Sequence, residues 1–273
     1  MSRTSWGLAC LLLALVAGCD RSASPTPTTP PPTIAAGGLL AVAQPVSAAP
    51  SAPGAIGVAP GPITVRYTFD GGVNQPITDL TGEHRLRALG ENGGALRLVP
   101  EGPGLAVSYP ARCHLPSEEN CPRAILEGVR DDRLNPGTRF LQYGASVLMT
   151  TTDLADGANV VQKGYSVGGV TQYKLQVDHY LGRPSCVLVG KSRKIYRAEP
   201  TRNVADGRWH NLMCTRSRDR LTMTIDGLEE TSVQVPPTLS IANPEPLRIG
   251  GKGAATGNDQ FAGEIDNVFV TIG

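Results

Sequence analysis

The chain has 273 residues, and its 25 Lys and Arg residues nearly balance its 24 Asp and Glu residues, which gives a formal net charge of +1. This balance excludes a strongly charged protein, so the composition favours neither nucleic acid nor an anionic membrane surface as a partner. The length fits one or two domains.

Residues 1–18 are predicted to be a signal peptide. Arg3 supplies the initial positive charge, and Leu8–Gly18 is an apolar run shorter than the roughly 20 residues that span a bilayer. The run ends in Leu15-Val16-Ala17-Gly18-Cys19, which is similar to the lipobox of bacterial lipoproteins. We therefore expect an exported protein that is anchored to a membrane only through a lipid on Cys19. The alternative is cleavage nearby, for instance after Ser24, which would give a freely secreted protein.

Residues 19–62 are predicted to be a disordered linker. The stretch from Ser22 to Val65 contains no charged residue and is rich in Pro, Ala, Thr and Gly. Such a segment cannot bury enough apolar surface to offset the entropy lost on ordering. Residues 63–273 remain, and a single β-domain often has about 200 residues.

The pattern of residues 63–273 predicts an all-β domain. Short runs of β-branched and aromatic residues alternate with Gly, Pro, Asn and Asp, and no convincing helical period occurs. Asp156-Gly157, Asp206-Gly207 and Asp226-Gly227 are tight-turn signals. Regularly spaced strands of this kind favour a sandwich or a barrel. The expected strands are Ile63–Phe69, Leu96–Val99, Leu105–Tyr109, Phe140–Thr150, Val160–Gln162, Tyr173–Val177, Ser185–Val189, Trp209–Thr215, Leu221–Ile225, Ser232–Val235, Leu247–Ile249 and Glu264–Ile272.

Four cysteines, Cys113, Cys121, Cys186 and Cys214, follow the leader, and an even number in an exported domain implies disulfides. Three pairings are possible. We expect Cys113–Cys121, which closes a short loop, and Cys186–Cys214, which joins two neighbouring strands. A zinc site is disfavoured because the sequence has no C-x-x-C and no His at ligand spacing.

Several segments, taken in order, resemble bacterial laminin G-like domains of the concanavalin A-like superfamily. Tyr67–Gly71 and Ile77–Gly82 resemble the opening of such domains, and Asp206-Gly207-Arg208-Trp209-His210 looks like their D-G-x-W-H element. Leu247–Gly251 and Phe261–Val268 resemble the closing strands. The loop that carries Cys113 and Cys121 has no counterpart in the pattern.

This resemblance implies a two-sheet antiparallel jelly-roll sandwich whose first and last strands pair. It also implies that the aromatic residues Phe69, Trp209 and Phe269 are buried in the core.

Catalytic residues are not expected. Glu264 and Asp266 alternate on one strand, as in β-glucanases of this fold class, but Val268 and Phe269 stand where the third acid of those enzymes would fall. The histidines are scattered at His84, His114, His179 and His210. We interpret His179 and His210 as structural residues.

Calcium is the cofactor that the resemblance suggests, because laminin G-like domains often hold Ca²⁺ through carboxylates and carbonyl oxygens. Asp70, Asp79 and Asp266 would supply carboxylates if the first and last strands pair. The alternative is that Asp70 and Asp79 cap turns through side-chain hydrogen bonds and that Asp266 faces solvent.

The leading functional hypothesis is a non-catalytic module at the cell surface that binds a carbohydrate or an extracellular protein. The alternative is a structural or adhesive envelope protein. A patch formed by Arg193, Lys194, Arg197 and Arg202 would favour an anionic polymer, although these cations also suit solvated strand faces. Three tyrosines that flank loops are candidates for stacking on sugars: Tyr165, Tyr180 and Tyr196.

Overall fold

The computed structural model describes residues 61–72, 76–155, 157–168, 170–178 and 181–273. The predicted signal peptide, Cys19, nearly all of the predicted linker, His179 and Tyr180 lie outside the described residues.

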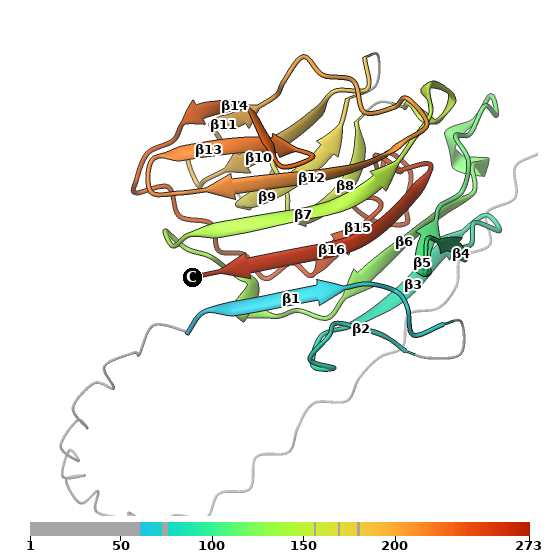
Figure 1. The fold of residues 1–273 in the computed structure, drawn as a ribbon, viewed down its shortest axis with the longest axis horizontal. Helices are drawn as coiled ribbons and strands as arrows, with labels where there is room; N and C mark the ends of the chain where they lie inside the picture. Colours follow the sequence, from blue (N-terminus) through green and yellow to red (C-terminus); the bar gives the residue numbers. More distant parts are fainter. Residues whose placement is uncertain (1–60, 73–75, 156, 169, 179–180) are drawn as a thin grey trace, which may run out of the picture. The chain divides into compact units, whose positions relative to one another are not determined.

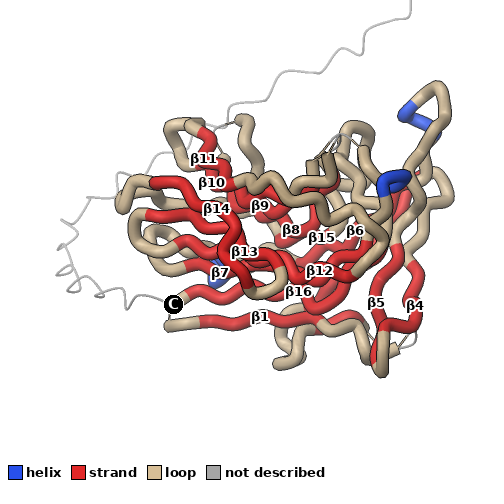
Figure 2. Tube along the Cα trace, turned by 45° about the horizontal axis from the view of Figure 1, so that its top comes forward, coloured by secondary structure: helices blue, strands red, loops and turns tan. Residues whose placement is uncertain are grey.

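Short strands account for nearly all regular structure in the described residues, and Figure 2 shows how little helix accompanies them. The strands are β1 (Ile63–Tyr67), β2 (Ile77–Thr78), β3 (Arg85–Glu91), β4 (Arg97–Glu101), β5 (Gly104–Ser108), β6 (Arg123–Gly128), β7 (Leu141–Leu148), β8 (Ala158–Gly164), β9 (Gln172–Val177), β10 (Pro184–Val189), β11 (Ile195–Ala198), β12 (Trp209–Arg216), β13 (Arg220–Ile225), β14 (Leu228–Gln234), β15 (Leu247–Ile249) and β16 (Glu264–Ile272). The helices are single 3₁₀ turns, η1 (Glu118–Asn120), η2 (Asp132–Leu134) and η3 (Thr151–Asp153).

The strands form two antiparallel sheets (Figure 1). Sheet A has the order β14-β13-β12-β7-β16-β5-β4, with β1 also paired to β16. Sheet B has the order β11-β10-β9-β8-β15-β6-β3-β2. The predicted two-sheet jelly-roll sandwich is thereby confirmed.

The core lies between the sheets and follows the two-residue alternation of the strands. In β9, Tyr173 and Leu175 are buried in the core, while Lys174 is only partly buried and lies on the other face. Tyr143 of sheet A meets Tyr173 with ring centroids 5.1 Å apart, and its hydroxyl donates to the carbonyl oxygens of Lys174 and Val187. These two hydrogen bonds join the sheets through the centre of the core.

The predicted pairing of the first and last strands is confirmed. Five residue pairs align β1 with β16, from Ile63 opposite Ile272 to Tyr67 opposite Val268. The outer neighbour of β16 changes along its length, because Glu264 and Ile265 pair with β5 and the later residues pair with β1. A β-bulge follows Asp266, and Asn267 has the left-handed φ of 49°.

The prediction that Trp209 and Phe269 enter the core is wrong, whereas Phe69 is buried as expected. In β12 the even-numbered residues face inward because Cys214 points to sheet B, so Trp209 lies half-buried on the outer face. In β16 the bulge leaves Val268 and Val270 inside and turns Phe269 outward.

Both expected disulfides are present, Cys113–Cys121 and Cys186–Cys214. The second joins β10 of sheet B to β12 of sheet A through the core, where both sulfur-bearing residues are fully buried. Closing a loop of this length stabilises the fold by about 3.5 kcal/mol in the chain-entropy description.

Candidate functional site

A cavity of about 710 Å³ opens at the rim of the sandwich, where three loops from distant parts of the sequence meet. We call it the rim cleft. The disulfide-closed loop forms one wall, and the segment before β16 forms the other. Its lining residues are Ala111, Arg112, Cys113, Leu115, Pro116, Glu118, Cys121, Pro122, Arg123, Leu154, Ala155, Gly257, Asn258, Asp259, Gln260 and Ala262. A concave site of this size on loops held by a rigid sandwich suits a small ligand or a polymer segment.

Side-chain amides and carboxylates fasten the loops of the rim cleft to one another. The Gln260 amide accepts a hydrogen bond from the Ala124 backbone N–H at 3.0 Å and donates to the Ala124 carbonyl oxygen at 2.9 Å. Glu118 in the disulfide loop accepts a hydrogen bond from the backbone N–H of Gly257. The walls of the cleft are therefore fixed by protein contacts and not only by the disulfide.

Asp259 holds a strained position in the cleft wall. Its φ is 51°, in the left-handed region that non-glycine residues occupy at a cost of roughly 1–3 kcal/mol, and such strain collects at functional sites. Its carbonyl oxygen accepts the Asn159 N–H at 2.9 Å, and its carboxylate Oδ1 accepts the Lys252 ammonium at 3.0 Å. Within the described residues, Oδ2 receives no hydrogen bond and is available to a ligand donor.

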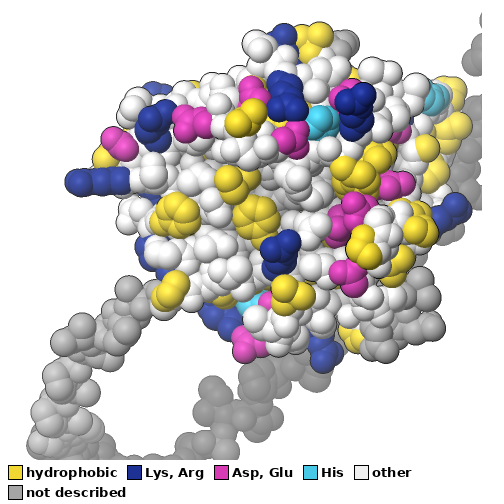
Figure 3. Space-filling model, viewed as in Figure 1, with side chains coloured by type: hydrophobic (Ala, Val, Ile, Leu, Met, Phe, Trp, Pro, Cys, Tyr) yellow, Lys and Arg dark blue, Asp and Glu magenta, His cyan; other side chains and the backbone are white. Residues whose placement is uncertain are grey.

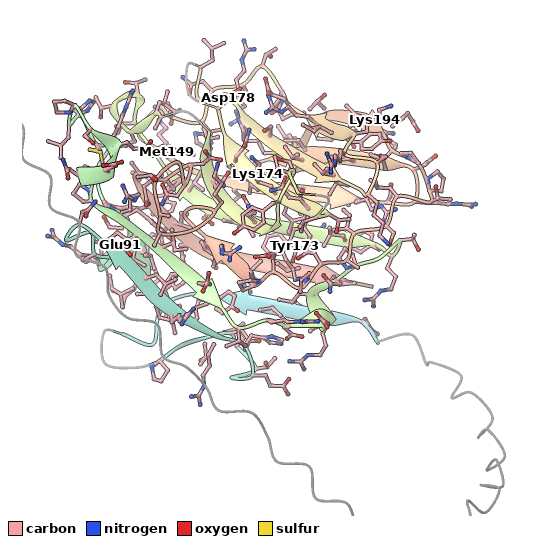
Figure 4. All side chains as sticks on the ribbon, turned by 180° about the vertical axis from the view of Figure 1, so that it is seen from behind. Glu91, Met149, Tyr173, Lys174, Asp178 and Lys194 are labelled. Carbon is pink, nitrogen blue, oxygen red and sulfur yellow. A yellow bond between two sulfur atoms is a disulfide. The ribbon has the colours of Figure 1, made fainter. Side chains whose placement is uncertain are left out.

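The outer face of sheet B adjoins this wall and is polar. A Cβ at Gly157 would lie in ordinary contact with the carboxylate of Asp259 and the amide oxygen of Gln176, both at about 3.9 Å, and the left-handed φ of 73° is what favours glycine here. Lys174 lies near the middle of this face (Figure 4), and burial lowers the pKa of its ammonium to about 8, against the opposing effect of Asp259. Polar groups thus continue from the rim cleft onto the sheet.

Two smaller cavities lie elsewhere on the domain. One of about 370 Å³ shares Ala111 and Pro122 with the rim cleft as a common wall. Another, of about 210 Å³, contains His84, whose Nδ1 lies 3.1 Å from the carboxylate of Asp131. Asp131 also accepts three side-chain hydrogen bonds from Arg133, so it belongs to a structural ion pair that orients the imidazole.

The three predicted calcium ligands do not converge. Asp79 caps its own turn, because Oδ2 accepts both the N–H and the hydroxyl of Thr81 and Oδ1 accepts the N–H of His84 at 2.9 Å. These hydrogen bonds hold the pKa of the Asp79 carboxyl below its usual value despite burial. Both oxygens of Asp79 are thus engaged, as expected for a turn-capping aspartate.

Asp70 and Asp266 retain part of the predicted calcium site. Asp266 is 5% exposed, and its Oδ1 is buried without a hydrogen-bond partner among the described residues. Burial, together with the negative charges of Glu101 and Asp70, raises the pKa of Asp266 to about 6. Asp70 itself accepts the Leu105 N–H at 2.9 Å. An orphaned carboxylate oxygen beside two further carboxylates suits a hard cation, but the described residues contain no group of three His, Cys, Asp or Glu side chains placed to hold a metal.

The paired carboxylates Glu264 and Asp266 line none of the three cavities described above. Burial raises the pKa of Glu264, and Asp153 and Glu101 add to the effect.

His210 has a structural role, since both ring nitrogens lie near carboxylates: Nδ1 lies 2.9 Å from Asp226 and Nε2 lies 3.1 Å from Asp206. It therefore joins the Asp206-Gly207 turn before β12 to the Asp226-Gly227 turn between β13 and β14.

Half of the predicted basic patch is neutralised, since Arg197 and Arg202 form ion pairs and Arg193 and Lys194 form none within the described residues. Arg197 pairs with Glu199 at 3.0 Å, and Arg202 pairs with Asp226 and Glu230 at 2.7 and 3.1 Å. On the face shown in Figure 3, Lys and Arg side chains lie apart from one another among Asp and Glu. Of the candidate tyrosines, Tyr165 donates to the Lys252 carbonyl oxygen, and Tyr196 lies beneath the Lys194 ammonium. The patch therefore gives little support to binding of an anionic polymer at this place.

Comparison with known proteins finds a matching superfamily model and several solved structures with a similar fold. Residues 145–271 match the model of the concanavalin A-like lectin/glucanases superfamily. Domain 4 of AbnA, an extracellular arabinanase from Geobacillus stearothermophilus solved with arabinotriose, superposes with a TM-score of 0.56 over 77% of this chain and 91% of that one, at 14% identity. The domain has a jelly-roll fold of the concanavalin A-like type. No curated protein sequence matches the chain.

Two toxin binding domains share the jelly roll. The binding domain of Paraclostridial Mosquitocidal Protein 1 has a TM-score of 0.56 at 12% identity, and the binding domain of Botulinum Neurotoxin DC in complex with SialylT has 0.53 at 9%. Each alignment covers 76% of this chain but only 48% and 47% of those chains, so the chain spans about half of their length.

Solved domains similar to the jelly roll are thus mainly binding domains. Two disulfides together with this fold indicate an extracellular location. None of the helices in the described ranges has the length and apolar character of a membrane span.

Proposed function

We propose that the jelly-roll domain is a non-catalytic module that binds carbohydrate through the rim cleft. The observation that carries the proposal is Asp259, a strained residue with a free carboxylate oxygen in the wall of a rigid cavity of about 710 Å³. A carboxylate accepts hydrogen bonds from sugar hydroxyls, while side-chain amides both donate and accept. Arabinotriose in the AbnA domain and SialylT in the neurotoxin domain support a saccharide as the class of ligand.

The neighbouring groups suit the same ligand. The partly buried Lys174 continues the polar surface beyond Asp259. Leu115 and Pro116 supply an apolar wall on the opposite side, where Leu115 is 52% exposed. A few polar groups that fix orientation beside apolar walls are typical of small-molecule sites.

We expect Asp259→Gly to weaken glycan binding by about tenfold or more, since removal of the carboxylate leaves bound hydroxyls without an acceptor. Glycine tolerates the left-handed backbone at this position, so the fold is expected to persist. The measurement is binding of the full chain to a glycan and cell-wall polysaccharide array, with circular dichroism as the check on folding.

Arg193→Gly is the matched control, because Arg193 also has a left-handed φ, of 61°, but lies on the exposed β10–β11 hairpin away from the cleft. If Asp259→Gly binds as well as the unchanged chain, the rim cleft is not the site. If the unchanged chain binds no glycan, the proposal of carbohydrate binding is wrong, and a protein becomes the favoured class of partner.

We also propose that the module is anchored through Cys19 after removal of residues 1–18. The supporting features are the apolar run Leu8–Gly18 and the small residues Ala17 and Gly18 before the thiol. A Cys19→Ser variant is expected to leave the membrane fraction and lose incorporation of labelled palmitate. Equal labelling of the variant and the unchanged chain would contradict the anchor.

We propose that Asp266 and Asp70, but not Asp79, are ligands of a structural calcium ion. The buried oxygen of Asp266 that lacks a partner supports it. Asp266 lies at the bulge where the outer neighbour of β16 changes from β5 to β1, so a cation there would link both strands to β16.

A further inference from the structure

Arg123 is an unusual lining residue of the rim cleft because its guanidinium is nearly buried without a carboxylate partner. The residue is 5% exposed. Nε donates to the Ala254 carbonyl oxygen at 2.9 Å, and Nη1 donates to the Glu118 carbonyl oxygen at 2.6 Å. Nη2 makes no hydrogen bond in the part of the chain that the structure describes. Burying a charge without an opposite charge costs several kcal/mol, so a counter-ion is expected nearby.

Other buried arginines are satisfied differently. Arg248 pairs with the carboxylates of Glu127 and Glu245. Arg216, which is fully buried, donates to four backbone carbonyl oxygens and lines none of the three cavities. Arg123 has half as many carbonyl acceptors as Arg216, and its remaining donor belongs to a group that faces the cleft.

Arg112 lines the same cleft and adds a second positive charge. Its side chain is exposed and makes no hydrogen bond or ion pair to any residue of the described ranges. The carboxylates of the cleft already have donors, since Asp259 accepts the Lys252 ammonium and Glu118 accepts the Gly257 N–H. The lining of the cleft holds two cations, Arg112 and Arg123, and two carboxylates, Glu118 and Asp259. Because Lys252 beside the cleft already pairs with Asp259, both arginines are left without a carboxylate partner in the described residues.

We infer that the rim cleft takes an acidic saccharide whose carboxylate or sulfate group is held by Arg112 and Arg123. This inference rests on the proposed carbohydrate function and names its ligand class. A planar guanidinium presents paired N–H donors that match the oxygens of a carboxylate or sulfate, and such charge-assisted hydrogen bonds are stronger than neutral ones. Asp259 is left to contact hydroxyl groups of the same saccharide.

The test is an array of matched pairs probed with the full chain. Uronic-acid oligosaccharides are compared with their methyl esters, and sulfated glycans with their desulfated forms, so the two arms distinguish the carboxylate from the sulfate. The charged member of a pair is expected to bind about tenfold or more tightly, with an affinity that falls as salt concentration rises. Arg112→Gln should remove most of this preference, whereas Arg112→Lys should retain part of it.

Arg218→Gln is the matched control, since Arg218 is also exposed but lies in the β12–β13 turn. Arg112 is the primary variant because changing the buried Arg123 can unfold the loop. If charged and neutral members bind equally and Arg112→Gln changes nothing, the acidic ligand is wrong while carbohydrate binding stands. If neither member of any pair binds, the proposed function itself fails.

Discussion

Replacing Arg216 with methionine is expected to lower the free energy of unfolding by about 3–5 kcal/mol, the largest loss for any single substitution considered in this domain. The guanidinium of Arg216 donates to the carbonyl oxygens of Gly137 and Arg139 on one loop and of Leu239 on another, at 3.2, 3.0 and 2.7 Å. Methionine has a similar length but no donor, so it would leave these carbonyl groups buried and unpaired.

Chemical denaturation followed by tryptophan fluorescence measures the loss. Arg216→Lys should recover only part of the lost stability, because a single ammonium lacks the forked donors with which the planar guanidinium reaches both loops. Arg218→Ala, two residues away and exposed, should change stability by less than about 0.5 kcal/mol. A loss below about 1 kcal/mol for Arg216→Met would show that the two loops hold together without it.

In calcium-free buffer at pH 7, Asp266→Asn is expected to stabilise the domain by up to about 3 kcal/mol. The folded-state pKa of Asp266 is raised from 3.8 to about 6, chiefly by burial and then by Glu101 and Asp70. A raised carboxyl pKa means that the folded chain binds the proton more tightly than the unfolded chain. The associated stability is full below pH 3.8 and is lost as the pH rises through about 6, and asparagine avoids this loss.

Thermal unfolding of both chains between pH 4 and pH 7 measures the difference, which should vanish near pH 4. Adding millimolar calcium at pH 7 should raise the Tm of the unchanged chain and leave Asp266→Asn unaffected, because only a carboxylate neutralises the cation. Asp79→Asn should show the same calcium response as the unchanged chain. A Tm independent of calcium in the unchanged chain would remove the metal from the proposal.

The fold was predictable because most strands have a local β pattern and their order matches the family pattern, although β2, β3, β6 and β11 were not among the expected strands. The resemblance to laminin G-like domains predicted the pairing that β1 and β16 make. What the local pattern could not supply is which face of a strand turns inward. Trp209 was expected inside because it stands in the D-G-x-W-H element of the resembled family. The inward position of Cys214 instead places the even-numbered residues of β12, His210 among them, on the inner face.

The candidate site was less predictable because its parts become neighbours only in the folded domain. Asp259 sits in a Gly-rich stretch between Gly250 and Gly263, which the sequence marks only as a loop. Arg112 and Arg123 flank the disulfide loop, and neither carries a motif. The cysteines at 113 and 121 were the available signal, since a covalently closed loop without a counterpart in the family pattern marks added structure at the rim.

The pairing of β1 with β16 also determines how the domain would carry a mechanical load. The rim cleft ends at Ala262, just before β16 begins at Glu264, whereas the chain enters the domain at Ile63, opposite Ile272. These two points are separated by the length of β16, about 30 Å for nine extended residues. A pull between a ligand in the cleft and the N-terminal end of β1 would therefore run along the two strands. All five residue pairs between β1 and β16 would be loaded together in shear, so none could be peeled away singly. The pairing of these two strands would therefore resist separation by such a pull.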